Sequence, residues 1–156
     1  MEDVDKQDIL QMDDAEFNND VYAKLTIAAR LHDIRLVKCE YWIKPNIFDA
    51  LEDLSNFGFS GEPIGFHFDT NSGVAMGQYR WEAEVKLGRR KVLKHVAEYL
   101  ITYVELNDFE ERYARFYFEK VGRFATYPYF RSDFSHQSSG SGITLPPLPS
   151  LNERVN

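Results

Sequence analysis

The sequence of 156 residues holds a single cysteine, Cys39, and no long apolar run. One thiol cannot form an internal disulfide, and its isolation fits a reducing compartment. No apolar stretch approaches the roughly 20 residues that cross a bilayer, and no signal-peptide pattern opens the chain. These absences predict a cytoplasmic protein without membrane insertion.

The chain also lacks a basic surface, since its formal net charge is -7. Residues 1–20 carry eight acidic side chains and one lysine, so this stretch alone accounts for the net charge. A protein that binds nucleic acid needs a basic stripe, which argues against a nucleic-acid partner. We expect residues 1–17 to form an acidic disordered arm.

No motif for catalysis, a cofactor or a metal stands out. His67 and Asp69 alternate on a predicted strand, and with Glu82 or Glu84 across a sheet they could form an acid–base or metal site. Polar residues at alternate strand positions are more typical of a solvated face, and Cys39 is expected to be a packed thiol. The sequence therefore predicts no enzyme, no cofactor and no metal.

Aromatic residues, in contrast, are abundant: they make up 15% of the chain, with 12 Phe, 9 Tyr and 2 Trp. Such a surplus serves either a large core or an adhesive surface for partners.

The most regular pattern lies in residues 78–106. Between residues 79 and 87 apolar and charged residues alternate, as in a half-buried strand. A polar turn follows at residues 88–91, led by Gly88, which accepts a positive φ. Residues 92–106 then read as a second strand, apolar on both faces near its end, which requires cover from helices or another subunit. The pattern predicts a long antiparallel hairpin.

Upstream, residues 21–31 predict a helix capped by Asn18 or Asn19, and the alternation of residues 22–28 also allows a strand. Residues 32–44 predict a strand, and a change of parity near Val37 indicates a bulge. Residues 46–63 are expected to form a connection, with a possible short helix over 47–54 and turn signals at Gly58, Gly61 and Pro63. Residues 64–69 predict a further strand.

Downstream, Asn107 is a candidate helix cap with Glu110 at the third helical position, and Gly122 a candidate stop. A second helix is expected from Thr126, with Pro128 in its first turn, until residues 138–142 break it. Residues 143–149 must be extended because their prolines restrict the backbone. The order predicts an α+β fold, with a four-stranded antiparallel sheet and helices on one face, over residues 18–151, followed by a flexible end at 152–156.

Several segments resemble the SecB export chaperone family. Residues 127–131 (Tyr-Pro-Tyr-Phe-Arg) resemble the start of its long helix, Gly140 or Gly142 takes the position of its glycine turn, and residues 145–149 resemble its extended Leu/Pro stretch. Residues 29–36 resemble the first strand of SecB-like chaperones associated with toxin–antitoxin systems.

The resemblance implies an ATP-independent chaperone without catalytic residues, assembled as a dimer of dimers. Its clients would be unfolded polypeptides, either preproteins or an antitoxin, held in apolar grooves. The matching groove positions are Trp42, Tyr99, Phe124, Tyr127, Leu145 and Leu148. The family's carboxy-terminal tail helps to engage the export motor ATPase, whereas the acidic stretch here is amino-terminal. Motor binding is therefore the weaker expectation, and a stand-alone or toxin–antitoxin role the stronger one.

Two other interpretations stay open. One is a small enzyme or ligand-binding protein on a curved antiparallel sheet, with a closed aromatic pocket served by His67 and Asp69. The other is an adaptor that binds one dedicated partner through its acidic arm or through the PxxP pattern of Pro146 and Pro149.

Overall fold

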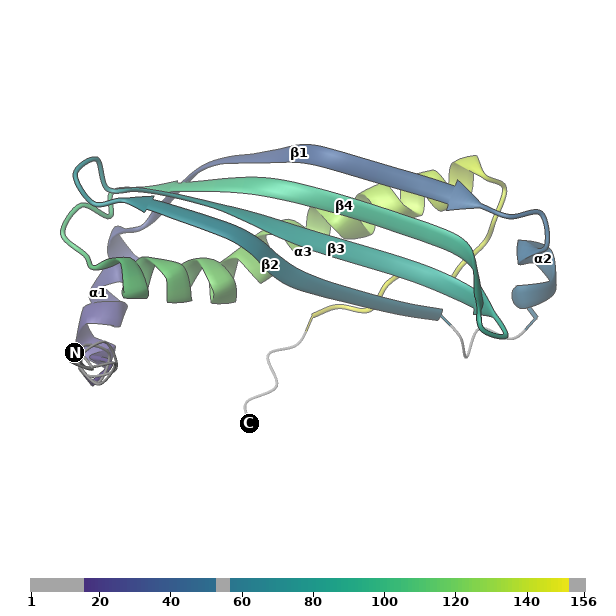
Figure 1. Ribbon diagram of the computed structural model, residues 1–156, viewed down its shortest axis with the longest axis horizontal. Coiled ribbons are helices and arrows are strands. Elements are labelled where there is room, and N and C mark those ends of the chain that lie inside the picture. The colour runs from purple at the N-terminus through teal and green to yellow at the C-terminus, as the bar shows by residue number, and fades with distance from the viewer. Residues whose placement is uncertain (1–15, 53–56, 152–156) are drawn as a thin grey trace, which may run out of the picture.

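A long antiparallel sheet with a helix along one face dominates the computed structural model, which describes residues 16–52 and 57–151 (Figure 1). The elements are α1 (Asn19–Ala28), β1 (Arg30–Ile43), α2 (Ile47–Ala50), β2 (Phe57–Asp69), β3 (Val74–Leu87), β4 (Arg90–Val104) and α3 (Glu111–Gly140). The sheet order is β1-β4-β3-β2. The predicted α+β class, with four antiparallel strands and helices on one face, is confirmed.

Parts of the predicted boundaries fall outside the described residues. These are residues 1–15 of the expected acidic arm and the expected flexible end at 152–156. Within the described residues, no helix is both long and apolar enough to cross a membrane.

The central hairpin forms as its alternation predicts. On β3, Trp81, Ala83 and Val85 are fully buried toward α3, while the charged residues between them are only half buried. Gly88 has a φ of +64° in the turn to β4. The opposite face of the sheet carries ion pairs, among them Lys91 Nζ at 2.7 Å from Glu84 Oε2 and Arg80 Nη1 at 3.5 Å from Glu98 Oε1.

The register of β1 explains its change of parity. The pairing with β4 shifts between Leu36 and Lys38, so Val37 is the extra residue and the predicted bulge is confirmed. As a result Leu36, opposite Tyr99, and Cys39, opposite Ala97, face the same side of the sheet. That side is the one α3 covers.

The prediction that residues 46–63 connect two strands is wrong beyond residue 56, because β2 begins at Phe57 and includes its turn signals. Gly61 lies against the ring of Trp81, where an added Cβ would be 2.4 Å from a ring carbon. Pro63 is tolerated because β2 is an edge strand. Gly61 therefore allows close packing and Pro63 is compatible with an edge strand, and neither residue lies in a loop.

Near the amino terminus, α1 is capped by Asn18, whose side chain accepts from the backbone N–H groups of Asp20 and Val21. The helix ends at Ala28, three residues before the predicted end, and β1 begins at Arg30. The possible helix over 47–54 is the single turn α2, and residues 53–56 lie outside the described residues.

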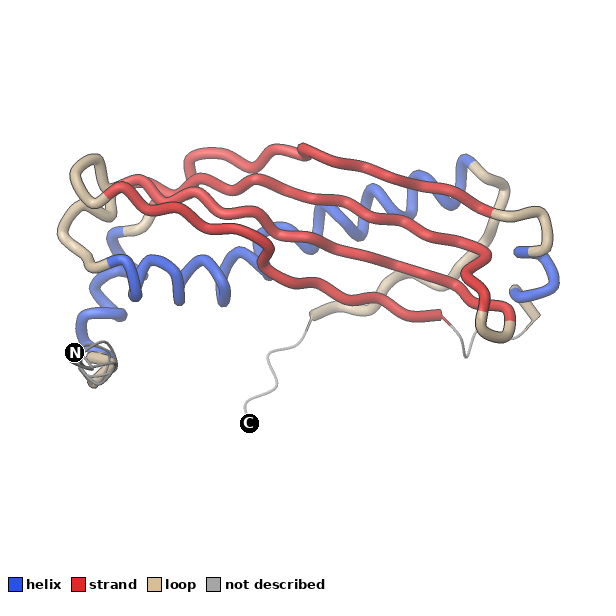
Figure 2. The backbone as a smooth tube through the Cα atoms, in the orientation of Figure 1, coloured by secondary structure: helices blue, strands red, loops and turns tan. Residues whose placement is uncertain are grey.

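The prediction of two helices after residue 106 is wrong, because α3 is one helix of 30 residues. Gly122 does not end it: a Cβ there would lie 3.1 Å from Ile101 Cδ1, so the glycine lets the helix approach the sheet closely. Pro128 lies inside the helix, which changes direction near its middle (Figure 2). At roughly 45 Å, the helix matches the length of the strands beneath it.

Both ends of α3 differ from prediction. The cap is Glu110 and not Asn107, which lies in a turn before the helix. At the other end, the N–H of Gly142 donates to the carbonyl of Ser139, and the N–H of Ile143 to that of Ser138. With a φ of +72° at Gly142, this is a Schellman motif, and Gly142 rather than Gly140 makes the turn.

Candidate functional site

The extended segment after α3, residues 143–151, turns back along the helix, and we call it the crossover segment. It forms a pocket of about 240 Å³ with the carboxy-terminal half of α3. The pocket is lined by Arg131, Ser132, Phe134, Ser135, Ser138, Leu145, Pro146, Pro147 and Leu148. Apolar side chains and one guanidinium group therefore border the same space.

Buried side chains and one hydrogen bond hold the crossover segment against the core of the domain. The Leu148 side chain is buried with 1% exposure, and Ile143 is nearly as buried. The Tyr127 hydroxyl donates a hydrogen bond to the carbonyl of Pro149, and its ring packs against Trp81 and Phe59. The prolines thus belong to a packed structural element, which weakens the interpretation of the PxxP pattern as a free polyproline II ligand.

Four of the six predicted groove residues gather on this flank of α3. Leu145 and Leu148 line the pocket, and Tyr127 holds the segment that carries them. Phe124 is 40% exposed and precedes Arg131 by two helical turns, which places both on one side of the helix. The flank therefore continues from the pocket toward the amino-terminal half of α3.

The other two predicted residues lie elsewhere. Tyr99 is buried on β4, on the opposite flank of α3, and its ring contacts that of Tyr129 with centroids 6.4 Å apart. Burial raises the pKa of the Tyr99 phenol. Trp42 lies opposite Lys94 on the sheet face that α3 does not cover, with its indole N–H donating to Glu40 Oε1. Trp42 is thus apart from the other five.

The flank beside β1 presents three exposed apolar side chains that were not predicted. We define the β1–α3 surface by these residues, Leu31, Leu36 and Tyr129. Tyr129 is 56% exposed and Leu36 is 50% exposed, although they stand over and beside the buried Tyr99. Tyr129 belongs to the segment 127–131 that carried the resemblance, and a helical reading of that segment from Tyr127 could have found it.

The residues considered for an acid–base or metal site do not come together in the structure. The Asp69 carboxylate accepts from the hydroxyl of Ser72 and the N–H of Asn71 in the turn after β2, and these bonds, the one from Ser72 first, lower its pKa. His67 is exposed on the edge strand β2. Glu82 and Glu84 both pair with Lys91 on the face opposite α3.

The fold is that of a SecB-like chaperone: four antiparallel strands, a long helix along one face and an extended segment returning over it. Among solved structures, the SecB-like chaperone Rv1957 of Mycobacterium tuberculosis, in complex with a ChAD peptide from the Rv1956 HigA1 antitoxin, superposes with a TM-score of 0.70. It is 21% identical, and the alignment covers 87% of this chain and 99% of that one.

Other comparisons add little. A protein of unknown function from Streptococcus agalactiae gives a TM-score of 0.40 at 6% identity over 78% of this chain and 97% of that one, too low to support an argument. No protein family matches the sequence, and no curated protein does. The likeness to the mycobacterial chaperone therefore establishes the fold, and function must be argued from the surfaces of this chain.

Proposed function

We propose that this protein is a SecB-like molecular chaperone that holds unfolded polypeptides, without ATP, on the two flanks of α3. The observation that carries the proposal is the exposure of large apolar side chains along both flanks, on a fold shared with a chaperone seen in complex with an antitoxin peptide. Proteins that act alone rarely leave such side chains grouped at the surface.

The two flanks offer what an extended client needs. The pocket between the crossover segment and α3 provides a partly open space for an apolar client side chain, with Arg131 at its border. The β1–α3 surface is open, and its tyrosine and leucine side chains give contact area to many sequences. Burial of a few hundred Å² at about 25 cal/mol per Å² supplies useful affinity before the cost of association.

We propose an antitoxin or a preprotein as the client class and the cytoplasm as the location. Binding to the export motor ATPase is the weaker part of the proposal, because the acidic stretch of this chain is at its amino end. We propose no catalytic activity, since the candidate acid–base residues are engaged in a turn and in ion pairs.

We also propose a homo-oligomer, a dimer of dimers. β1 is an edge strand of 14 residues that, within the described part of the chain, pairs with β4 alone, and Val37 at its bulge is half exposed. Edges of this length are normally covered, because unpaired backbone groups and apolar side chains associate. Light scattering after size exclusion measures the assembly, and a monomer at working concentration would contradict this part.

The proposal is tested by the suppression of light scattering from an unfolded client, with and without ATP. We expect suppression near equimolar ratios that ATP does not change. Clients of two kinds, an antitoxin and a preprotein, separate the two proposed roles. If neither client is held in solution at an excess of the protein, and neither is captured by it, the chaperone proposal is wrong.

A further inference from the structure

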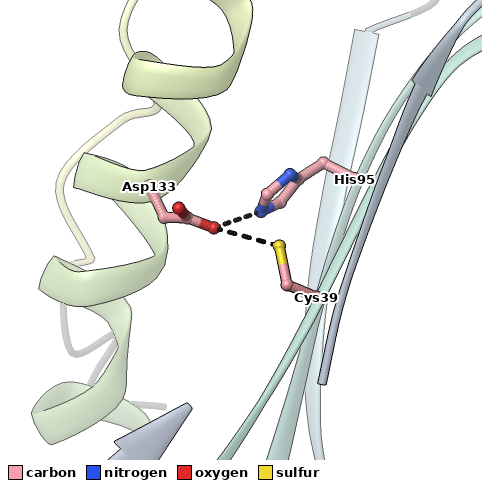
Figure 3. A group of neighbouring side chains, drawn as sticks. All are labelled: Cys39, His95 and Asp133. Carbon is pink, nitrogen blue, oxygen red and sulfur yellow. Dashed lines mark hydrogen bonds and ion pairs between the residues drawn. The ribbon is translucent and has the colours of Figure 1, made fainter. Parts of the chain in front are cut away.

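Three side chains that can bind a metal ion meet where β1, β4 and α3 come together (Figure 3). Cys39 Sγ lies 3.6 Å from Asp133 Oδ2, and His95 Nε2 lies 2.9 Å from the same oxygen. The three candidate ligand atoms are all within 4.8 Å of one another. The residues are far apart in the sequence, and the fold alone brings them together.

The bonding of His95 is incomplete. The imidazole is fully buried among the rings of Tyr41, Phe130 and Phe134. Its Nε2 reaches Asp133 at ion-pair distance but makes no hydrogen bond of proper geometry, and its Nδ1 has no partner among residues 16–52 and 57–151. A buried polar side chain aimed into a cluster without satisfying its hydrogen-bonding capacity calls for another occupant.

We propose that Cys39, His95 and Asp133 form a binding site for a divalent metal ion of the zinc class. One sulfur, one imidazole nitrogen and one carboxylate oxygen is a ligand set that suits Zn²⁺, and three protein ligands leave a fourth position open. This site is separate from both client surfaces in its chemistry, although Cys39 and Asp133 come from the same two elements as the β1–α3 surface.

Two of the three pairs of ligand atoms lie close to the separation that the ion requires, and the third pair is within 4.8 Å. In a tetrahedral site with bonds of about 2.0–2.3 Å, ligand atoms lie roughly 3.3–3.6 Å apart. The Cys39–Asp133 distance of 3.6 Å already fits, and the His95–Asp133 contact needs to open by about 0.4 Å. Cys39 is exposed and the Asp133 side chain is 24% exposed, so an ion can enter from solvent.

Cobalt(II) provides a direct test on the full chain after removal of metals with a chelator. Because Cys39 is the sole cysteine, any sulfur-to-cobalt charge-transfer absorption reports this site alone. We expect the band to saturate at one Co²⁺ per chain and to disappear when Zn²⁺ is added. Competition with a colorimetric chelator then gives the Zn²⁺ affinity.

Two variants and one control separate a site from chance binding. C39S should abolish the band, and both C39S and D133N should weaken Zn²⁺ binding by more than roughly 10-fold, the smallest loss expected for a residue that supports a metal site. H67A removes an exposed histidine of β2 and should match the parent protein. Both C39S and D133N replace side chains by near-isosteres with solvent access, and thermal unfolding verifies that they fold.

The outcomes are distinct. Absence of the charge-transfer band in the parent protein, or Zn²⁺ affinities of C39S and D133N equal to that of H67A, would overturn the proposal. Neither result would affect the chaperone proposal, whose readout is client aggregation.

Discussion

The indole N–H of Trp81 donates a hydrogen bond of 2.8 Å to the hydroxyl of Thr126, and both side chains are fully buried. The same hydroxyl donates to the carbonyl of Gly122, one turn earlier in α3. This chain of two bonds joins the middle of the sheet to the middle of the long helix. It fixes α3 at the point where Gly122 and Pro128 would otherwise weaken it.

Replacing Thr126 by valine keeps the shape of the side chain but leaves the buried Trp81 N–H without an acceptor. We expect T126V to lower the free energy of unfolding by about 1–3 kcal/mol, the cost of an unsatisfied buried donor. Urea unfolding followed by Trp fluorescence measures the change. T126S keeps the hydroxyl and serves as the control; an equal loss in both variants would assign the effect to packing.

Removing the Tyr127 hydroxyl should release the crossover segment without unfolding the domain. In Y127F the carbonyl of Pro149 loses its donor, while the ring still packs against Trp81. We expect a loss of about 0.5–1.5 kcal/mol and faster amide exchange in residues 143–151. Hydrogen exchange with mass spectrometry detects it, and exchange confined to other segments would contradict the assigned role.

Leu145 and Leu148 allow the client surface to be separated from the core. Leu145 is half buried in the pocket wall and Leu148 is fully buried. L148A should cost about 2–5 kcal/mol of stability. L145S should leave the melting temperature nearly unchanged while weakening client capture, with L87S, at an exposed position next to the hairpin turn, as its control. Equal client capture by L145S and L87S would exclude the pocket as a client site.

On the other flank, Tyr129 tests the β1–α3 surface. Y129S removes a ring that is 56% exposed and should reduce client capture several-fold with little effect on stability. F48S is the matched control, because Phe48 on α2 is 58% exposed but lies outside both flanks. Titration with a labelled unfolded client compares them, and a larger loss for F48S would place the client elsewhere.

The ion pairs on the sheet face opposite α3 predict that the stability of the fold depends on pH. The hydrogen bond from Lys91 lowers the pKa of Glu84 below its ordinary value, so the pair stabilises the folded state above that ordinary pKa. The contribution is lost as the pH falls through the lowered pKa of the folded state. Because both side chains are partly exposed, we expect K91M to remove no more than about 1 kcal/mol at pH 7 and nothing in strong acid. Unfolding at several pH values tests this, and a loss that grows toward acid would contradict it.

The sequence predicted the parts of the fold that are set by local patterns. The alternation around Trp81 identified β3, the turn at Gly88 identified the hairpin, and the parity change near Val37 identified a bulge. The sequence prediction failed at residues whose type suggests a local turn or helix end but which make close tertiary contacts instead. Gly61 suggested a loop and Gly122 a helix end. In the structure, Gly61 allows close packing of the Trp81 ring, and Gly122 allows close packing of the Ile101 side chain.

The candidate site divides in the same way. Tyr127, Leu145 and Leu148 were predicted from two segments that resemble the SecB family, residues 127–131 and 145–149, and the structure places them on one flank of α3. The exposure of Tyr129 follows from its place off the helix face formed by Tyr127, Phe130 and Phe134, but its contact with Tyr99 depends on how α3 packs on the sheet, which no local pattern encodes. Cys39, His95 and Asp133 come from three elements, so their meeting could not be predicted before the register was known.

Pro63 has a consequence for how copies of this protein can assemble. It lies in β2, the strand at one border of the sheet, and it has no N–H to offer an incoming strand. β1, at the other border, contains no proline in its 14 residues. If β1 pairs with a second copy, as proposed, the joined sheets end on both sides at β2, where the missing N–H of Pro63 disfavours a further strand.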